Sequence, residues 1–149
     1  MGNLSFLVPT KNLKIFNQDK IFEMLQKEFP EFKISSDDEF KEISVRTKKD
    51  VLVTEIFCNT DCYLVDYDQD IEYLKDSENH IQNPNELIFK LEILRKFNPD
   101  LHNCLSLTYG TGMFVDDKFR VERFLTKQFN GYLFDEGIHP EFQTFEEVD

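Results

Sequence analysis

The pattern of apolar and polar positions predicts a chain of short strands interrupted by a few helices. Ile43 and Val45 alternate with polar residues, the stretch TKKD follows, and a second apolar run begins at Val51, which together predict a hairpin. Other short apolar stretches are bounded by turn-forming residues and predict further strands. In all, we predict strands over residues 3–9, 32–36, 40–46, 51–58, 62–68, 104–110 and 132–135.

Three longer segments have apolar residues three and four positions apart, which is the spacing of an amphipathic helix. Asn17 is a suitable N-cap for the first, and Asn83 for the second, in which Pro84 takes the first helical position. An Asn-Gly pair is a typical end for the third. The predicted helices cover residues 18–29, 84–97 and 116–129, and we expect the third to turn Phe119, Phe124, Leu125 and Phe129 inward.

Because most strands follow one another as hairpins, with helices near the start and in the second half, the sequence predicts an α+β fold. We expect a mainly antiparallel sheet with about three helices packed on one face. The length of 149 residues is usual for one domain, so we assign residues 1–149 to a single domain, with 136–149 as a candidate acidic tail. With 40% hydrophobic residues, the chain can build a core without disulfides or metals.

The sequence predicts a cytoplasmic protein. It shows no apolar run of about 18 residues that would span a membrane, and its start lacks a signal-peptide pattern. Cys58, Cys62 and Cys104 are an odd number of cysteines, which argues against a disulfide framework and favours reduced, buried thiols. The excess of Lys, Asn, Ile and Phe is typical of an AT-rich microbial genome, so we expect a bacterial source.

Acidic residues are concentrated in two segments of the chain. The formal net charge is −12, of which residues 61–80 contribute −6 and residues 135–149 another −6. The remaining 114 residues hold 16 acids and 16 bases. Such patches repel the phosphates of nucleic acid and attract a basic protein. We therefore expect a basic protein partner, and neither a nucleic acid nor a membrane.

The stretch VDYDQDIEY at residues 65–73 lies at the centre of the first acidic segment. Asp66, Asp68 and Asp70 have the spacing of the first ligands of a calcium loop. However, Ile71 stands where such a loop needs Gly, and Ser77 stands where it needs the closing carboxylate. An alternating strand, with tyrosines on one face and carboxylates on the other, is the better interpretation. Such a strand either binds a partner or only protects a sheet edge.

Size, segregated charge and the lack of a catalytic motif favour a protein-binding module. The sharper hypothesis is an immunity or antitoxin-like protein that neutralises a basic toxin domain, such as a nuclease, by covering its phosphate-binding cleft with carboxylates. A phage-borne or housekeeping interaction domain without a toxin is an alternative. The predicted partner-binding residues are Asp61, Tyr63, Asp66, Tyr67, Asp68, Asp70, Glu72, Asp135 and Glu136.

No motif predicts a metal, a cofactor or a reaction. Cys58 and Cys62 form a C-x3-C spacing without the second tight pair that zinc sites use. The turn YGTGMF lacks the third Gly of a dinucleotide-binding motif. The alternative from another class is a small cytosolic enzyme that uses the Gly110–Gly112 turn together with His102 and Cys104, which would share one face of a strand.

Overall fold

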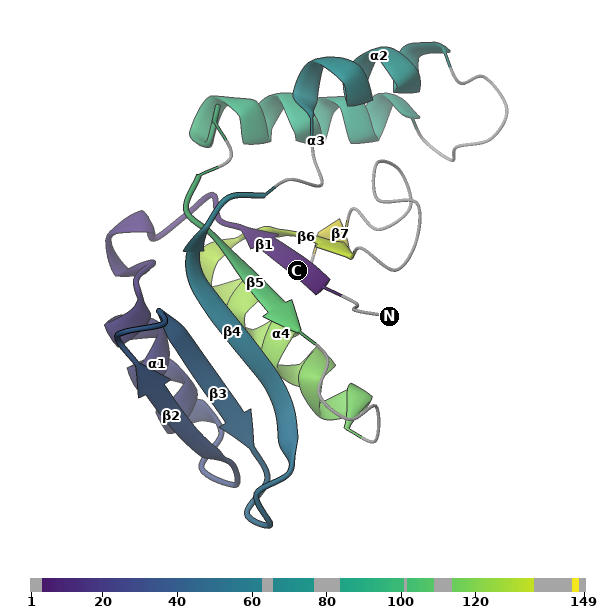
Figure 1. Cartoon of the computed structure of the whole chain (residues 1–149). Helices are drawn as coiled ribbons and strands as arrows, with labels where there is room; N and C mark the ends of the chain where they lie inside the picture. The colour runs from purple at the N-terminus through teal and green to yellow at the C-terminus, as the bar shows by residue number, and fades with distance from the viewer. Residues whose placement is uncertain are drawn as a thin grey trace.

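The computed structural model describes residues 4–62, 66–76, 84–100, 102–108, 114–135 and 146–147. The described part of the chain forms an antiparallel sheet of seven strands (Figure 1). Its strands are β1 (Leu4–Val8), β2 (Lys33–Asp37), β3 (Glu42–Arg46), β4 (Leu52–Thr60), β5 (Cys104–Thr108), β6 (Tyr132–Asp135) and β7 (Glu146–Glu147). Hydrogen bonds join them in the order β2-β3-β4-β5-β1-β6-β7, so β1 lies inside the sheet between β5 and β6.

The predicted hairpin over residues 40–58 is confirmed as the β3–β4 pair. Ile43 lies opposite Ile56 in the antiparallel register, which places both side chains on the same buried face. In the connecting turn, the Asp50 amide donates to the Thr47 carbonyl at 2.8 Å, and Asp50 has a positive φ of 69°. Asp tolerates this left-handed conformation better than most residues, so the stretch TKKD makes the turn that the sequence predicts.

Helices connect the strands in the described ranges. They are η1 (Leu13–Ile15, a 3-10 helix), α1 (Gln18–Glu28), α2 (Tyr67–Asp76), α3 (Pro84–Phe97) and α4 (Val115–Phe129). Asn17 caps α1, because its side chain accepts a hydrogen bond from the Lys20 amide at 3.0 Å. The predictions for α1, α3 and α4 are confirmed to within a residue or two, whereas α2 was not predicted.

The end of α4 is closed by the Asn-Gly pair that the sequence predicts as a stop. Asn130 takes a left-handed conformation with φ of 43°, and the Gly131 amide donates to the Thr126 carbonyl at 2.9 Å. A side chain at position 131 would meet Leu7 Cδ1 and the Val8 carbonyl oxygen at 2.8 Å each. Glycine is therefore required here, because the chain leaving α4 passes directly beside β1.

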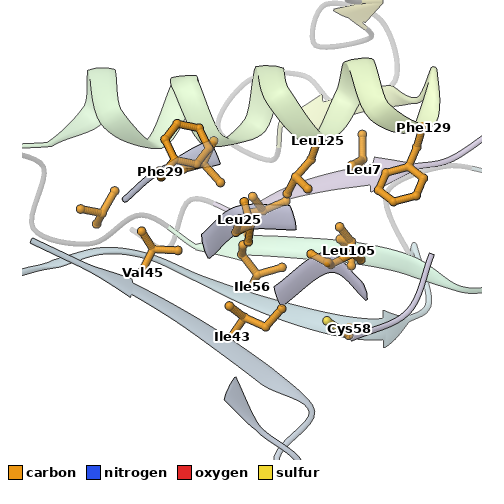
Figure 2. Packing of buried hydrophobic residues seen from close by; sticks show 14 of the residues in the cluster. Leu7, Leu25, Phe29, Ile43, Val45, Ile56, Cys58, Leu105, Leu125 and Phe129 are labelled. Carbon is orange, nitrogen blue, oxygen red and sulfur yellow. The ribbon is translucent and has the colours of Figure 1, made fainter. Parts of the chain in front are cut away.

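The α+β class and the antiparallel sheet are confirmed. The described residues contain four α-helices where about three were expected, and the helices cover both faces of the sheet and not only one. Leu7 of β1 packs toward α1 and α4 (Figure 2), whereas its neighbours Phe6 and Val8 face α2 and α3. The main core consists of Leu7, Phe16, Ile21, Leu25, Phe29, Phe32, Ile43, Val45, Val53, Ile56, Cys58, Leu105, Leu107, Val121, Leu125, Phe129 and Leu133. The second core consists of Phe6, Val8, Cys62, Tyr67, Ile71, Leu74, Leu91, Leu94, Cys104 and Tyr132.

The predicted strand over residues 62–68 is wrong at its end, because the chain from residue 67 to residue 76 forms α2, whereas residues 63–65 lie outside the described residues. Tyr67, Ile71 and Leu74 stand four and three positions apart, and all three are buried on the inner side of this helix. The alternating carboxylates fall at the helix start, where acidic side chains interact favourably with the N-terminal amides. Burial of the apolar residues at the helical period therefore decides the local structure.

A buried ion pair occupies the inner side of α4. Phe119 is 41% exposed, so the expectation that it faces the core is wrong. Lys118 is fully buried instead, with its Nζ 2.7 Å from Glu122 Oε2 and 2.9 Å from Ser5 Oγ. These two charged residues share the inward stripe of α4 with Leu125, and pairing them compensates part of the cost of burying each charge.

Candidate protein-binding surface

The start of α2 is held by two acidic side chains. Asp66 Oδ1 accepts a hydrogen bond from the Gln69 amide at 3.1 Å, which is an N-cap interaction. In return, Asp70 Oδ2 accepts a hydrogen bond from the Asp66 amide at 3.0 Å. Asp70 is only 6% exposed. This predicted partner-binding carboxylate therefore orders the helix start and lies beneath the surface that a partner would meet.

Tyr67 fixes the inner side of α2 against α3. Its hydroxyl donates to the Asn98 carbonyl at 2.7 Å, and the Arg95 guanidinium carbon lies 5.3 Å from the centre of its ring. Burial raises the pKa of Tyr67 well above its usual range. Tyr67 is thus a member of the second core, and this predicted partner-binding residue is not part of the exposed surface.

The outer side of α2 is acidic. Asp68, Glu72 and Asp76 follow one another at intervals of four residues, which places them on one side of the helix, and all three are exposed. Asp66 at the start of α2 and Glu92 on α3 are exposed as well. We name these five residues the acidic helical face. Figure 1 shows that α2 and α3 lie side by side at one end of the sheet.

The acidic helical face borders a hollow of about 510 Å³ between α2 and α3. An ion pair crosses this hollow, because Arg95 Nη2 lies 2.6 Å from Asp68 Oδ1. The Asp68 side chain is nevertheless 93% exposed, so solvent screens this pair. Four carboxylates against two basic groups leave the hollow negative, and its lining residues are Asp68, Glu72, Asp76, Glu92, Lys75, Arg95 and Ile71.

A second polar cluster forms where β4 ends and β5 begins. His102 Nδ1 lies 2.6 Å from Asp61 Oδ1, and both side chains are exposed. Asp61 raises the pKa of His102, because its carboxylate accepts the imidazole hydrogen bond and attracts the positive charge. A smaller hollow of about 230 Å³ lies beside His102, and its other lining residues are Pro9, Leu13, Phe16, Asn59, Asn98 and Asn103. None of these described lining residues is a nucleophile.

His102 and Cys104, which the enzyme alternative pairs, occupy different environments. His102 is exposed, whereas Cys104 is fully buried in the second core. The Cys104 thiol donates to the Thr60 carbonyl at 3.1 Å across the β4–β5 pairing. Thr108, at the other end of β5, is the last described residue before the Gly110–Gly112 turn, which lies outside the described residues. Although His102 and Cys104 are close in the sequence, their side chains therefore do not line one common hollow.

The structure brings together only part of the predicted binding site. Asp66, Asp68 and Glu72 gather on the acidic helical face, on a helix in place of the predicted strand. Asp61 stands apart from them in the polar cluster between β4 and β5. Asp135 belongs to β6, where it lies opposite residue 5 of β1. The two acidic segments of the sequence are thus attached to different parts of the sheet.

Sequence reasoning missed Asp76 and Glu92 as members of the surface. The spacing of Asp76 from the earlier acids of α2, four residues at each step, could have identified it once the segment was treated as a helix. Glu92 gave no such signal, because it joins the surface only through the packing of α3 beside α2. Of the remaining predicted residues, Tyr63 and Glu136 lie outside the described residues.

Comparisons of this chain with protein-family models, with curated proteins and with solved structures found no match. Within the described residues, no helix is long and apolar enough to cross a membrane. In the same part of the chain, no group of three or more His, Cys, Asp or Glu side chains is placed to hold a metal ion. Functional interpretation therefore depends on the surfaces described above.

Proposed function

We propose that this chain is a protein-binding module that neutralises a basic toxin domain, in the manner of an immunity or antitoxin-like protein. The observation that carries the proposal is the acidic helical face, a row of exposed carboxylates along α2 and the neighbouring part of α3. Clustered like charges steer an oppositely charged partner and speed its association. A domain with a phosphate-binding cleft presents the basic surface that such a row would cover.

The row of carboxylates has a regular geometry that supports this role. Residues four apart on a helix rise about 6 Å along its axis, so Asp68, Glu72 and Asp76 form an ordered line of negative charge. Tyr67 and Leu74 pack α2 against α3, so the row of carboxylates stands on an ordered helix. An ordered charged surface loses less conformational entropy on binding than an unfolded segment with the same charge would.

The alternative of a small enzyme receives less support from the arrangement of its expected residues. Cys104 is fully buried, and the described residues that line the hollow beside His102 include no nucleophile. An Asp–His pair alone is a common surface ion pair. The alternative of an interaction domain without a toxin shares the acidic helical face, and only an assay of protection separates it from our proposal.

The test of the proposal is charge reversal on the acidic helical face. The probe is a nuclease toxin domain with a basic phosphate-binding cleft, taken from the neighbouring gene if that gene encodes one. Glu72→Lys, Asp76→Lys and Glu92→Lys together should weaken binding at least about tenfold at low salt and remove protection of cells that express the domain. Calorimetry at low and high salt measures the affinity, and growth of co-expressing cells measures protection.

A matched control separates the contribution of this surface to binding from the contribution of net charge. Glu23→Lys, Glu28→Lys and Glu39→Lys make the same change in charge at exposed positions on α1 and between β2 and β3. We expect this second triple variant to bind almost as the unmodified chain does. Equal weakening by both variants would show that only net charge matters and would overturn the surface proposal. Binding without protection would favour the interaction domain that acts without a toxin.

A further inference from the structure

Two cysteine thiols meet at the base of the α2–α3 pair. Cys62 follows the end of β4, and Cys104 opens β5, so they mark the two chain segments that lead into and out of these helices. The Cys62 side chain is close enough to the Cys104 sulfur to influence its pKa. Thr60 lies opposite Cys104 in the strand register and holds it with its carbonyl oxygen at 3.1 Å from the sulfur. Both cysteines belong to the second core.

We propose that Cys62 and Cys104 form an oxidation site at which a peroxide converts the two thiols into an intramolecular disulfide. The two side chains are neighbours within the second core, so the bond would join groups that already lie close together. Disulfides in cytosolic proteins are usually transient and redox-sensing, which is the behaviour expected of such a pair. The inference is independent of the proposed toxin partner, because the reaction is measured on this chain alone.

The reaction proceeds in two balanced steps. The Cys104 thiolate attacks one peroxide oxygen, the O–O bond breaks, and the leaving hydroxide takes a proton to form water, so that Cys104 becomes a sulfenic acid. The Cys62 sulfur then attacks the Cys104 sulfur, the S–O bond breaks, and the leaving hydroxide takes the Cys62 proton. Two thiols are thereby oxidised and one peroxide is reduced to two water molecules.

The local environment favours Cys104 as the attacking group. Its pKa is lowered, because the side chains of Cys62 and Thr60 donate hydrogen bonds that stabilise the thiolate, against the opposing effect of burial. Cys58 offers a natural contrast, because burial in the main core raises the pKa of its thiol to about 12. A thiolate is the reactive form, so Cys58 should resist the oxidant that modifies the pair.

Burial sets the rate of this reaction. Cys62 is 4% exposed and Cys104 is fully buried. However, Asp61 precedes Cys62 in the chain, His102 comes two residues before Cys104, and both of these side chains are exposed. Each buried thiol therefore follows closely after an exposed residue, and we expect a local opening of the second core to admit a small oxidant. We expect a slow reaction that accelerates under mild destabilisation.

The disulfide would join the two chain segments at the base of the α2–α3 pair. It closes a loop of roughly 40 residues, and cross-linking such a loop reduces the conformational entropy of the unfolded chain. We expect the Tm of the oxidised protein to rise by roughly 5–15 °C. The bond would also restrict movement of α2 and α3 relative to the sheet.

The experiment treats the full-length reduced protein with hydrogen peroxide, then unfolds it in N-ethylmaleimide and maps its peptides by mass spectrometry. We expect a linked peptide that joins Cys62 to Cys104, together with alkylated Cys58. Cys58→Ala should give the same link at a similar rate. Cys62→Ala should give no link and a slower oxidation of Cys104, because it also removes the hydrogen bond that lowers the pKa of Cys104. Dithiothreitol should return the Tm of the oxidised protein to its starting value.

Several results would overturn the proposal. They are oxidation of Cys58 at the rate of Cys104, links formed only between molecules, and conversion of both thiols to sulfinic acids without a link. If Cys62→Ala does not fold, the peptide map of the unmodified protein and of Cys58→Ala still decides, because neither measurement needs that variant.

Discussion

The main core and the second core share one sheet but differ in what they contain. Among the described residues, the main core joins seventeen buried residues, mostly of the strands, α1 and α4, whereas the second core joins ten. The second core also includes the Tyr67 hydroxyl and the paired thiols of Cys62 and Cys104, and its helices carry the acidic helical face. We therefore expect the larger core to provide most of the stability, whereas the smaller one supports the surface and the thiols on which our two proposals depend.

One of the two largest expected effects on the free energy of unfolding comes from the buried ion pair on the main-core side of the sheet. Lys118→Met leaves the carboxylate of Glu122, which is 3% exposed, without its cation. We expect the free energy of unfolding to fall by about 3–5 kcal/mol, measured by urea denaturation. Lys118→Met combined with Glu122→Leu should recover most of this loss, because it removes both charges. A single variant as stable as the unmodified chain would contradict the buried pairing.

Matched leucines test the two cores directly. Leu125 in the main core and Leu94 in the second core are both fully buried. We expect Leu125→Ala to lower the free energy of unfolding by about 3–5 kcal/mol and Leu94→Ala by about 2–3 kcal/mol, because the smaller core can relax around the cavity. Hydrogen exchange should then increase across the whole sheet for the first variant and mainly in α2 and α3 for the second. The same exchange pattern for both variants would show that the two cores unfold as one unit.

Matched helix caps test whether α2 is less stable than α1, with a smaller expected effect on the free energy of unfolding. Asn17→Ala removes the cap of α1, and Asp66→Ala removes the cap of α2. Each change should cost about 1 kcal/mol. Only Asp66→Ala should accelerate amide exchange in α2, by roughly fivefold, because that helix belongs to the less stable part. Equal acceleration in α1 and α2 by either variant would contradict this separation.

The smallest expected effect is the pH dependence of stability that arises from His102. Because Asp61 raises the folded-state pKa of His102 above its unfolded value, the protonated imidazole contributes stability that is fully present below the unfolded pKa. This contribution is lost as the pH rises through the folded-state pKa. An NMR titration should show the raised pKa, and Asp61→Asn should return it toward 6.5, the ordinary value of histidine. An unchanged titration in Asp61→Asn would contradict the assignment of the cause.

Local sequence patterns were sufficient to predict most of the fold. The β3–β4 hairpin, α1, α3 and α4 follow from residue spacing, from the cap at Asn17 and from the stop at residues 130–131, all of which act over a few residues. The second helix escaped prediction, because the acids at its start alternate like those of a strand. The buried position of Lys118 also gave no local signal, since its partners Ser5 and Glu122 compensate the charge only after folding.

The candidate sites were harder to predict than the fold, because they depend on contacts between distant segments. Asp61 and His102 meet through the pairing of β4 with β5, which includes an irregular register. Cys62 and Cys104 meet through the same pairing. No spacing in the sequence encodes a contact of this kind. In contrast, the acidic helical face was partly predictable, because its charge is concentrated in one short segment.

The position of β1 inside the sheet has a consequence for the synthesis of this chain. Leu7 of β1 lies opposite Leu105 of β5 and Leu133 of β6, which are made roughly 100 residues later or more. At ribosomal rates of about 5–20 residues per second, β1 waits on the order of 5–20 s for its partners. The β2–β3–β4 strands and α1 can associate during that delay, while the apolar β1 remains open to misplaced pairing or to a chaperone.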